Sequence, residues 1–198
     1  MKKHQKALLV AAALVVSTFT FSGFGTGAAY AATPAAVLQT ESQMKPSSIS
    51  ELTNDTRVFK VDPKIEAKNV RFQNRYGFDV AGHLYLPKNF NAQKQYKAVV
   101  VSGPFGAVKE QSSGLYAQEM AKHGYVAVAF DPSMTGESGG TRRNMASPDI
   151  FAEDYSAAVD FISNLKFVNP DKVGAIGICG LSGMALTAAA NDTRIKAV

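Results

Sequence analysis

The chain has 198 residues, of which 46% are hydrophobic and 19% charged, a composition typical of a globular protein with one domain and a sizeable core. Its formal net charge is +5, but residues 1–31 hold three lysines and no acid, so the rest of the chain carries only +2. No cluster of Lys and Arg is interleaved with aromatic residues, which argues against nucleic acid as a partner. A single cysteine, Cys179, excludes an internal disulfide.

Residues 1–31 have the pattern of a signal peptide. A lysine-rich start precedes an apolar run at 7–16, and Ala29-Tyr30-Ala31 offers a small-x-small cleavage site. The apolar run is too short to span a membrane comfortably, so we expect cleavage and no stable membrane anchor afterwards. The sequence therefore predicts an exported protein, secreted or periplasmic.

Residues 32–66 have the composition of a linker or a loosely ordered arm. Few large apolar residues occur there, and Pro34 and Pro46 lie in turn-forming surroundings. Ser50, followed by Leu52, predicts the start of one short helix. The remaining residues, 67–198, are expected to form one domain.

That domain opens with two segments of alternating polarity, residues 70–73 and 78–86. A turn at 74–77 separates them, so the pair predicts an antiparallel hairpin. His83 falls on the polar phase of the second segment. We therefore expect its side chain to be solvated and not catalytic.

Strands and helices alternate through the rest of the domain. Leu115, Met120 and Ala121 mark the expected apolar face of the first helix, and Gly124 should end it. The predicted strands are 97–102, 125–130 and 173–178, and the predicted helices are 110–123 and 147–165. Short loops between such elements indicate parallel strands joined by right-handed crossovers. The predicted fold is α/β: a mostly parallel sheet opened by an antiparallel hairpin, with helices on both faces.

The segment 173–190 has the pattern of a buried strand, a tight turn and a small-residue helix. Cys179 falls at the turn, where flanking glycines allow a strained backbone and a close approach of helix to strand. This position is also a helix N-terminus, which favours a thiolate or an oxyanion. A lone cysteine is usually buried and inert, but the glycine spacing favours a reactive residue. The pattern is that of a nucleophile elbow with Cys in the Ser position.

Two registers match this elbow incompletely. Gly177-Ile-Cys179-Gly-Leu181 departs from G-x-nucleophile-x-G at Leu181, and Gly180-Leu-Ser182-Gly-Met184 departs from it at Met184. The nucleophile should directly follow the last strand residue, as Cys179 does after Ile178. Ser182 would lie inside the first helical turn. We therefore favour Cys179 as the nucleophile and keep Ser182 as the alternative.

Four segments in this order resemble the α/β-hydrolase superfamily, and the resemblance covers about Lys68 to Val198. Within the superfamily the chain is most similar to the dienelactone-hydrolase-like and X-Pro-dipeptidyl-peptidase-like branch, including polyketide-transferase-like members. The segments are Gly103-Pro-Phe-Gly-Ala-Val-Lys-Glu-Gln111, Phe130-Asp-Pro-Ser-Met-Thr-Gly-Glu-Ser-Gly139, Glu153-Asp-Tyr-Ser-Ala-Ala-Val-Asp160 and Gly177-Ile-Cys-Gly180.

The resemblance implies that Cys179 is the nucleophile and that backbone N–H groups form an oxyanion hole. One donor would be Gly180, and the other would be Phe105 or Gly106 in the loop after the third strand. Two converging donors stabilise the charge that develops on an attacked carbonyl. We interpret Asp131, Glu137 and Ser138 as turn-capping residues.

Hydrolases of this fold place an acid and then a histidine after the nucleophile. All three histidines here precede Cys179, and the only later acid, Asp192, is expected to be a loop residue. Residues 192–198 have the pattern of the start of another strand. The resemblance implies two further strands, an acid and a histidine, so the sequence is interpreted as a C-terminally truncated α/β hydrolase. Truncation would expose a sheet edge through which copies could self-associate.

The function expected from these features is hydrolysis of an ester, thioester or lactone, or acyl transfer, through a cysteinyl acyl-enzyme. The partner would be a small-molecule acyl substrate. The alternative is a non-catalytic binding module of the same fold, or an inactive remnant. We expect no cofactor and no metal, because the 103–106 loop lacks the phosphate-loop and dinucleotide patterns.

Overall fold

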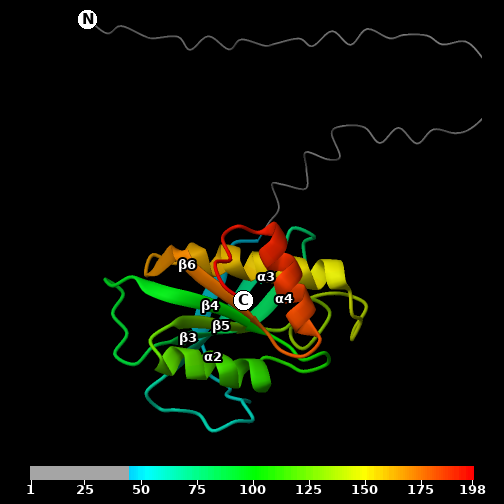
Figure 1. Cartoon of the computed structure of the whole chain (residues 1–198). Helices are drawn as coiled ribbons and strands as arrows, with labels where there is room; N and C mark the ends of the chain where they lie inside the picture. Colours follow the sequence, from blue (N-terminus) through cyan, green and yellow to red (C-terminus); the bar gives the residue numbers. More distant parts are fainter. Residues whose placement is uncertain (1–44) are drawn as a thin grey trace, which may run out of the picture.

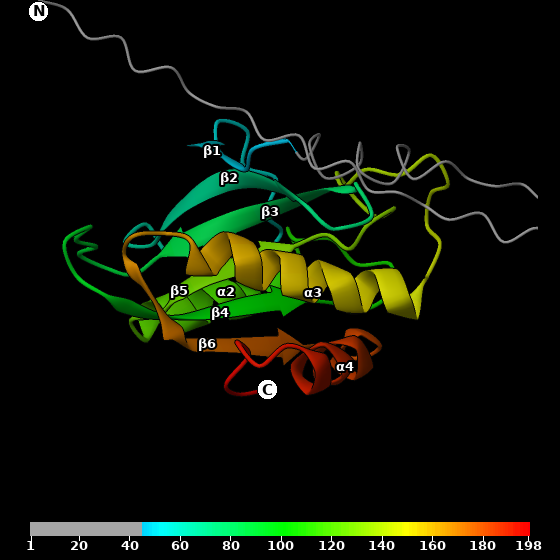
Figure 2. The same cartoon turned by 90° about the horizontal axis from the view of Figure 1, so that it is seen from above.

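The computed structural model describes residues 45–198, and a six-stranded mixed sheet forms their centre. The strand order is β1-β2-β3-β5-β4-β6, as Figure 2 shows from one edge to the other. The strands are β1 Ser48–Glu51, β2 Glu66–Gln73, β3 Asp79–Leu86, β4 Tyr96–Ser102, β5 Val126–Phe130 and β6 Val168–Gly177. The predicted signal peptide, residues 1–31, lies outside the described residues.

The predicted hairpin is confirmed as β2 and β3, which pair antiparallel with Val70 opposite Gly82. Its turn is held by Asn74, whose side-chain oxygen accepts the N–H groups of Tyr76 and Phe78, both at 3.0 Å. Strand β3 pairs antiparallel with β5, and β5, β4 and β6 are parallel to one another. The carboxyl ends of β4, β5 and β6 therefore lie at the same edge of the sheet.

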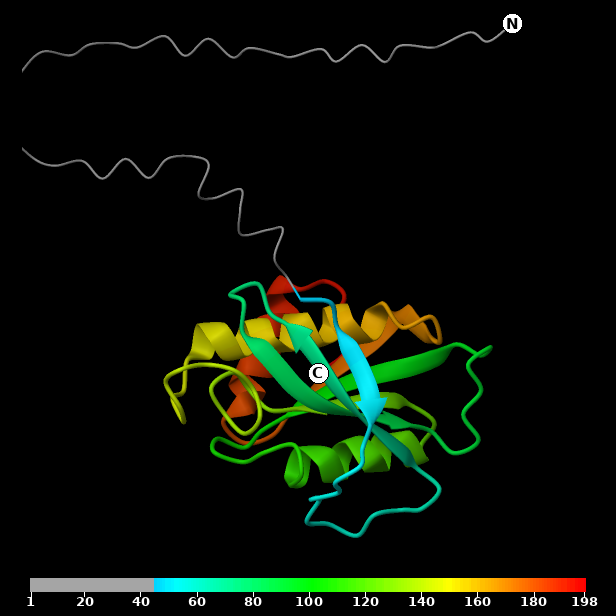
Figure 3. The same cartoon turned by 180° about the vertical axis from the view of Figure 1, so that it is seen from behind.

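The helix predicted to begin at Ser50 is wrong, because Ser48–Glu51 form the edge strand β1. This strand lies beside β2 at the edge of the sheet (Figure 3). The two strands pair antiparallel, with Ser50 opposite Asn69. The free backbone edge of β2 supplies a pairing partner that the local sequence does not reveal. Part of the predicted arm thus belongs to the sheet.

Three helices cover the sheet: α2 Ser112–Lys122, α3 Pro148–Ser163 and α4 Leu181–Asn191. Helix α2 lies on one face, and α3 and α4 lie on the other (Figure 1). Each face of the sheet buries its own apolar cluster. The smaller one surrounds Tyr85 and Val101 under α2. The larger one surrounds Val100 and Phe130 under α3 and α4. The predicted α/β layering, with helices on both faces, is confirmed. No helix within residues 45–198 is long and apolar enough to cross a membrane.

The buried face of α2 includes Ala121 and Met120, as predicted, but not Leu115, which is exposed. Gly114, Ala117 and Gln118 are buried in its place. Small residues let this helix approach the sheet closely. The Gln118 amide is satisfied there, since it donates to the Lys60 carbonyl at 3.0 Å and accepts the Asp62 N–H at 2.9 Å.

The chain continues beyond α4 along the outer edge of β6. Val173 and Ile195 form an isolated parallel bridge, and Ala175 donates its N–H to the Ala197 carbonyl at 2.9 Å. The predicted start of another strand after residue 192 is confirmed.

A substitution of Gly177 tests how closely α4 must approach β6. A Cβ at this position would lie 2.5 Å from the Ser182 Cα and 2.6 Å from the Leu181 carbonyl oxygen. We expect Gly177→Ala to lower the unfolding free energy by about 2–3 kcal/mol because the backbone must shift, as measured by urea denaturation.

The matched control is Gly183→Ala, in α4 itself, where a Cβ would meet nothing within 4 Å. There the higher helix propensity of Ala should raise the unfolding free energy by up to about 1 kcal/mol. Equal effects of the two substitutions would contradict the close approach.

Candidate functional site

The sequence-predicted elbow lies between β6 and α4. After Gly177, Ile178 donates its N–H to the Ser102 carbonyl at 3.0 Å, and Cys179 then adopts a φ of 55°. Non-glycine residues rarely take positive φ, and such strain persists only where the surroundings enforce it. Gly180 is already in the right-handed helical region and caps α4. The turn therefore presents an exposed Cys179 thiol beside a helix N-terminus.

Ser182, the alternative nucleophile, lies within the first turn of α4. Its hydroxyl donates to the Cys179 carbonyl at 2.6 Å, and its N–H donates to the same carbonyl at 3.1 Å. The serine side chain thus closes the turn that presents the cysteine. Cys179, and not Ser182, occupies the strained strand-to-helix position.

The loop after β4 lies directly against this turn, because β4 and β6 are parallel neighbours. A Cβ on Gly180 would overlap the Phe105 ring, so that ring covers the Gly180 backbone. Gly106 follows with a φ of 77° and is exposed. The structure thus brings together Phe105 and Gly180, two of the three residues that the resemblance implied for the oxyanion hole, and Gly106 is the next residue of the same loop.

A small hollow adjoins this loop. It has a volume of about 100 Å³ and a largely apolar wall in which Phe105 and Phe151 pack with ring centroids 6.2 Å apart. Its lining residues are Phe105, Gly106, Thr135, Asn144, Met145, Ala146 and Phe151. Phe105 links this hollow to the Cys179 turn, since the same ring covers the Gly180 backbone.

The predicted capping role is confirmed for Asp131 and Ser138 but not for Glu137, whose carboxylate pairs with Lys109 and Arg71. Asp131 accepts the N–H of Glu137 at 2.9 Å, and the Ser138 hydroxyl donates to the Asp131 carbonyl at 2.7 Å. The same hydroxyl accepts the Ala81 N–H at 2.9 Å, which connects this turn to β3.

Sequence reasoning missed Lys109, which is only 1% exposed and faces three carboxylates. Its ammonium lies 2.6 Å from Glu110, 3.0 Å from Glu137 and 3.2 Å from Asp131. Burial alone lowers the pKa of Lys109, but the attraction of Asp131 and the hydrogen bonds to Glu110 and Glu137 outweigh it, so the pKa is raised. The only signal in the sequence was the place of Lys109 in the glycine-loop segment.

The expectation that His83 is solvated is wrong, since its side chain is 2% exposed and lies 3.8 Å from Glu110. Strand β3 is buried along its length after Asp79, so alternation does not mark a solvent face there. His83 lies beside Glu110 and Lys109, in the segment before α2 that covers this face of the strand. Burial, together with the charge of Lys109, lowers the pKa of His83 to about 4, although Glu110 acts in the opposite direction. The imidazole is therefore neutral at physiological pH.

A second buried polar group connects α3 to the hairpin. Asp154 accepts the N–H and the hydroxyl of Ser133 and the side-chain amide of Asn74, each at 2.7 Å. Burial raises the pKa of Asp154 to about 6, although these hydrogen bonds act in the opposite direction. The network fixes the loop after β5 against α3.

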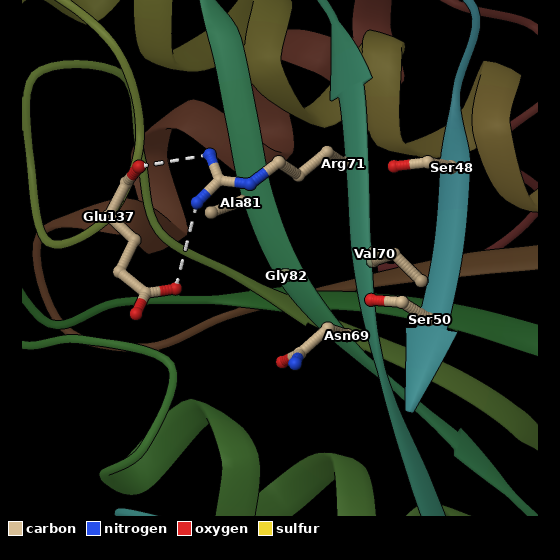
Figure 4. Close-up of a pocket in the computed structure, with 8 residues that line it drawn as sticks. All are labelled: Ser48, Ser50, Asn69, Val70, Arg71, Ala81, Gly82 and Glu137. Atoms are coloured by element: carbon tan, nitrogen blue, oxygen red, sulfur yellow. Dashed lines mark hydrogen bonds and ion pairs between the residues drawn. The ribbon is translucent and has the colours of Figure 1, made fainter. Parts of the chain in front are cut away.

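A polar cavity of about 270 Å³ lies on the antiparallel part of the sheet (Figure 4). Within it, Arg71 donates to the Glu137 carbonyl at 3.2 Å and lies 3.9 Å from the Glu137 carboxylate. Its lining residues are Ser48, Ser50, Asn69, Val70, Arg71, Ala81, Gly82 and Glu137. Because β5 and β4 separate these strands from β6, the cavity does not include the Cys179 turn. Within residues 45–198, no three His, Cys, Asp or Glu side chains are grouped so that they could hold a metal ion.

The known proteins that resemble this chain include the following three. PA2218 of Pseudomonas aeruginosa is 61% identical over 142 residues, which cover 72% of this chain and 38% of that protein. Its crystal structure superposes with a TM-score of 0.72 at 57% identity, covering 76% of this chain and 47% of that one. A thiohydrolase of Eupenicillium brefeldianum is 33% identical over 129 residues, which cover 65% of this chain and 40% of that protein. The α/β hydrolase GrgF of a Penicillium species superposes with a TM-score of 0.61 at 26% identity, covering 66% of this chain and 44% of that one.

A mixed sheet of this order, with a strained turn between β6 and α4, defines the chain as an α/β hydrolase in fold. Residues 77–198 match the X-Pro dipeptidyl-peptidase (S15) family, which is more than half of the chain. The chain therefore belongs to that family. It spans about two fifths of the length of the curated relatives that it matches.

Because His83 is buried and has a lowered pKa, we expect the stability of the protein to depend on pH. A His83→Gln variant should lack this contribution. The unfolded chain binds a proton at His83 below pH 6.5, but the folded chain binds it only near pH 4, so acidification favours unfolding. Relative to H83Q, we expect the wild type to lose about 2 kcal/mol of unfolding free energy between pH 6.5 and pH 4.5.

Urea denaturation of both proteins at each pH measures this difference. The comparison cancels the contribution of Asp154, whose raised pKa has the opposite effect: the folded state takes up that proton first and gains stability as the pH falls from about 6. A difference between the two proteins that stays constant with pH would show that His83 keeps its ordinary pKa.

Proposed function

We propose that Cys179 is the nucleophile of an acyl-transfer reaction on a small ester, thioester or lactone. The observation that carries this proposal is the positive φ of Cys179 at an exposed turn between β6 and α4. A backbone strain of this kind persists only where the surroundings enforce it, and it clusters at functional sites. The similarity to a thiohydrolase supports the thioester class.

In the proposed step the Cys179 sulfur attacks the carbonyl carbon, and the carbonyl electron pair moves onto the oxygen. The resulting oxyanion faces the N–H of Gly180 and that of Phe105 or Gly106, at the positive end of the α4 dipole. The Cys179 thiol gives its proton to water before the attack. Collapse of the intermediate re-forms the carbonyl and breaks the bond to the leaving alkoxide or thiolate, which takes up a proton from water and departs as the alcohol or thiol. The acyl group then remains on Cys179 as a thioester, ready for water or another acceptor.

Neither histidine of the described residues is placed to act as a general base for Cys179. His83 is buried beside Glu110, and the His123 ring donates to the Glu119 carbonyl at 2.8 Å at the end of α2. In this fold the base is a histidine that follows the nucleophile in the chain, and residues 180–198 contain none. The step that the described residues support is therefore acylation of Cys179.

The test is acylation of the full chain by p-nitrophenyl acetate, followed by peptide mapping of the acetylated residue. We expect an adduct on Cys179, and we expect Cys179→Ala to lower the acylation rate at least about a hundredfold. Ser182→Ala is the matched control and should keep the Cys179 adduct. Labelling of Ser182, or unchanged labelling of the C179A variant, would overturn the assignment.

We further propose that the protein is exported, because residues 1–31 combine a basic start, an apolar run and a small-x-small site. Expression of the full chain in a bacterial host should give a product outside the cytoplasm whose first residue is Ala32. A product that keeps Met1 and stays in the cytoplasm would contradict export.

A further inference from the structure

The buried lysine connects the two loops that border the Cys179 turn. Lys109 belongs to the loop after β4, which also carries Phe105 and Gly106, and Asp131 is the first residue after β5. The Lys109 N–H donates to one oxygen of the Asp131 carboxylate at 2.7 Å, and its ammonium donates to the other at 3.2 Å. Backbone and side chain of one lysine thus hold the same carboxylate.

This contact lies away from solvent, since Asp131 is 0% exposed and Lys109 is 1% exposed. A buried charge that loses its partner leaves the other charge uncompensated, so such a pair keeps its geometry. One Asp131 oxygen accepts the Lys109 N–H, and the other accepts both the Lys109 ammonium and the Glu137 N–H, the latter at 2.9 Å. The β4 loop can therefore shift only if the turn after β5 shifts with it.

A weaker contact extends this connection to the hairpin. The Glu137 carboxylate lies 3.0 Å from the Lys109 ammonium and 3.9 Å from the Arg71 guanidinium of β2 (Figure 4). Because Glu137 is 63% exposed, its charge is screened and it contributes less than Asp131. Substitution of Lys109 should therefore disturb this cluster of charges strongly, and substitution of Glu137 should disturb it only mildly.

We infer that Lys109 is a positioning residue that sets the distance between the Phe105–Gly106 N–H groups and the Cys179 turn. The inference rests on the proposed acyl transfer at Cys179. Oxyanion donors act only when they lie within hydrogen-bond distance of the developing charge, and a small displacement lowers the rate steeply. Lys109 touches no reacting atom, so its effect should appear only in the step that forms an oxyanion.

The test compares two reactions of the same thiol in the full chain. Acylation by p-nitrophenyl acetate passes through an oxyanion, whereas alkylation by iodoacetamide displaces iodide and forms none. In Lys109→Met, which keeps the length of the side chain, we expect acylation to slow about 10- to 100-fold relative to alkylation. Lys122→Met, which removes a surface ammonium 2.7 Å from Glu119, is the control and should leave the ratio unchanged.

If Lys109→Met prevents folding, which circular dichroism would report, Glu137→Gln takes its place in the test. We expect it to lower the same ratio about two- to fivefold, because the ammonium loses one of its three carboxylates. If K109M folds and both reactions slow equally, the lysine serves the fold alone. The same conclusion follows if K109M unfolds and the ratio is unchanged in E137Q. If the wild type is alkylated but not acylated at Cys179, the proposed function itself fails, and this inference fails with it.

Discussion

The close approach of α4 to the end of β6 is the constraint on which the site depends. Gly177 leaves no room for a Cβ beneath the first turn of α4, and the chain between them must reverse within a few residues. The reversal forces Cys179 into a positive φ, a conformation whose cost the surrounding packing must offset. Ser182 completes the turn by donating to the Cys179 carbonyl. The exposed thiol thus follows from how helix and strand pack.

The parallel arrangement of β4, β5 and β6 brings the other parts of the site to the same edge of the sheet. The loop after β4 contributes Phe105 and Gly106, and buried carboxylates hold this loop and the next one in place. Asp131 accepts backbone N–H groups from both loops, while Asp154 accepts from the loop after β5 and from the hairpin turn. Buried polar groups must be satisfied, so each of these contacts also restricts where its loop can lie.

Sequence reasoning predicted the features that local patterns encode. The apolar runs predicted the strands and helices of the domain, and the glycine spacing around Cys179 predicted the turn between β6 and α4. The predictions from sequence failed where the position or burial of a residue depends on a partner far away in the chain. Strand β1 exists because the edge of β2 was free, and His83 is buried because the segment of Lys109 and Glu110 covers its face of β3. Lys109 pairs with Asp131 across 22 positions, which no local pattern could reveal. The role of Cys179 stays a prediction that chemistry must test.

The most direct measurement is a crystal structure of the chain after reaction with a small trifluoromethyl ketone, which mimics the acyl group and traps the tetrahedral state. The account predicts a bond from the Cys179 sulfur to the ketone carbon. It also predicts that the former carbonyl oxygen lies within hydrogen-bond distance of the N–H of Gly180 and that of Phe105 or Gly106. Attachment at Ser182, or an adduct on Cys179 whose oxygen faces solvent, would contradict it.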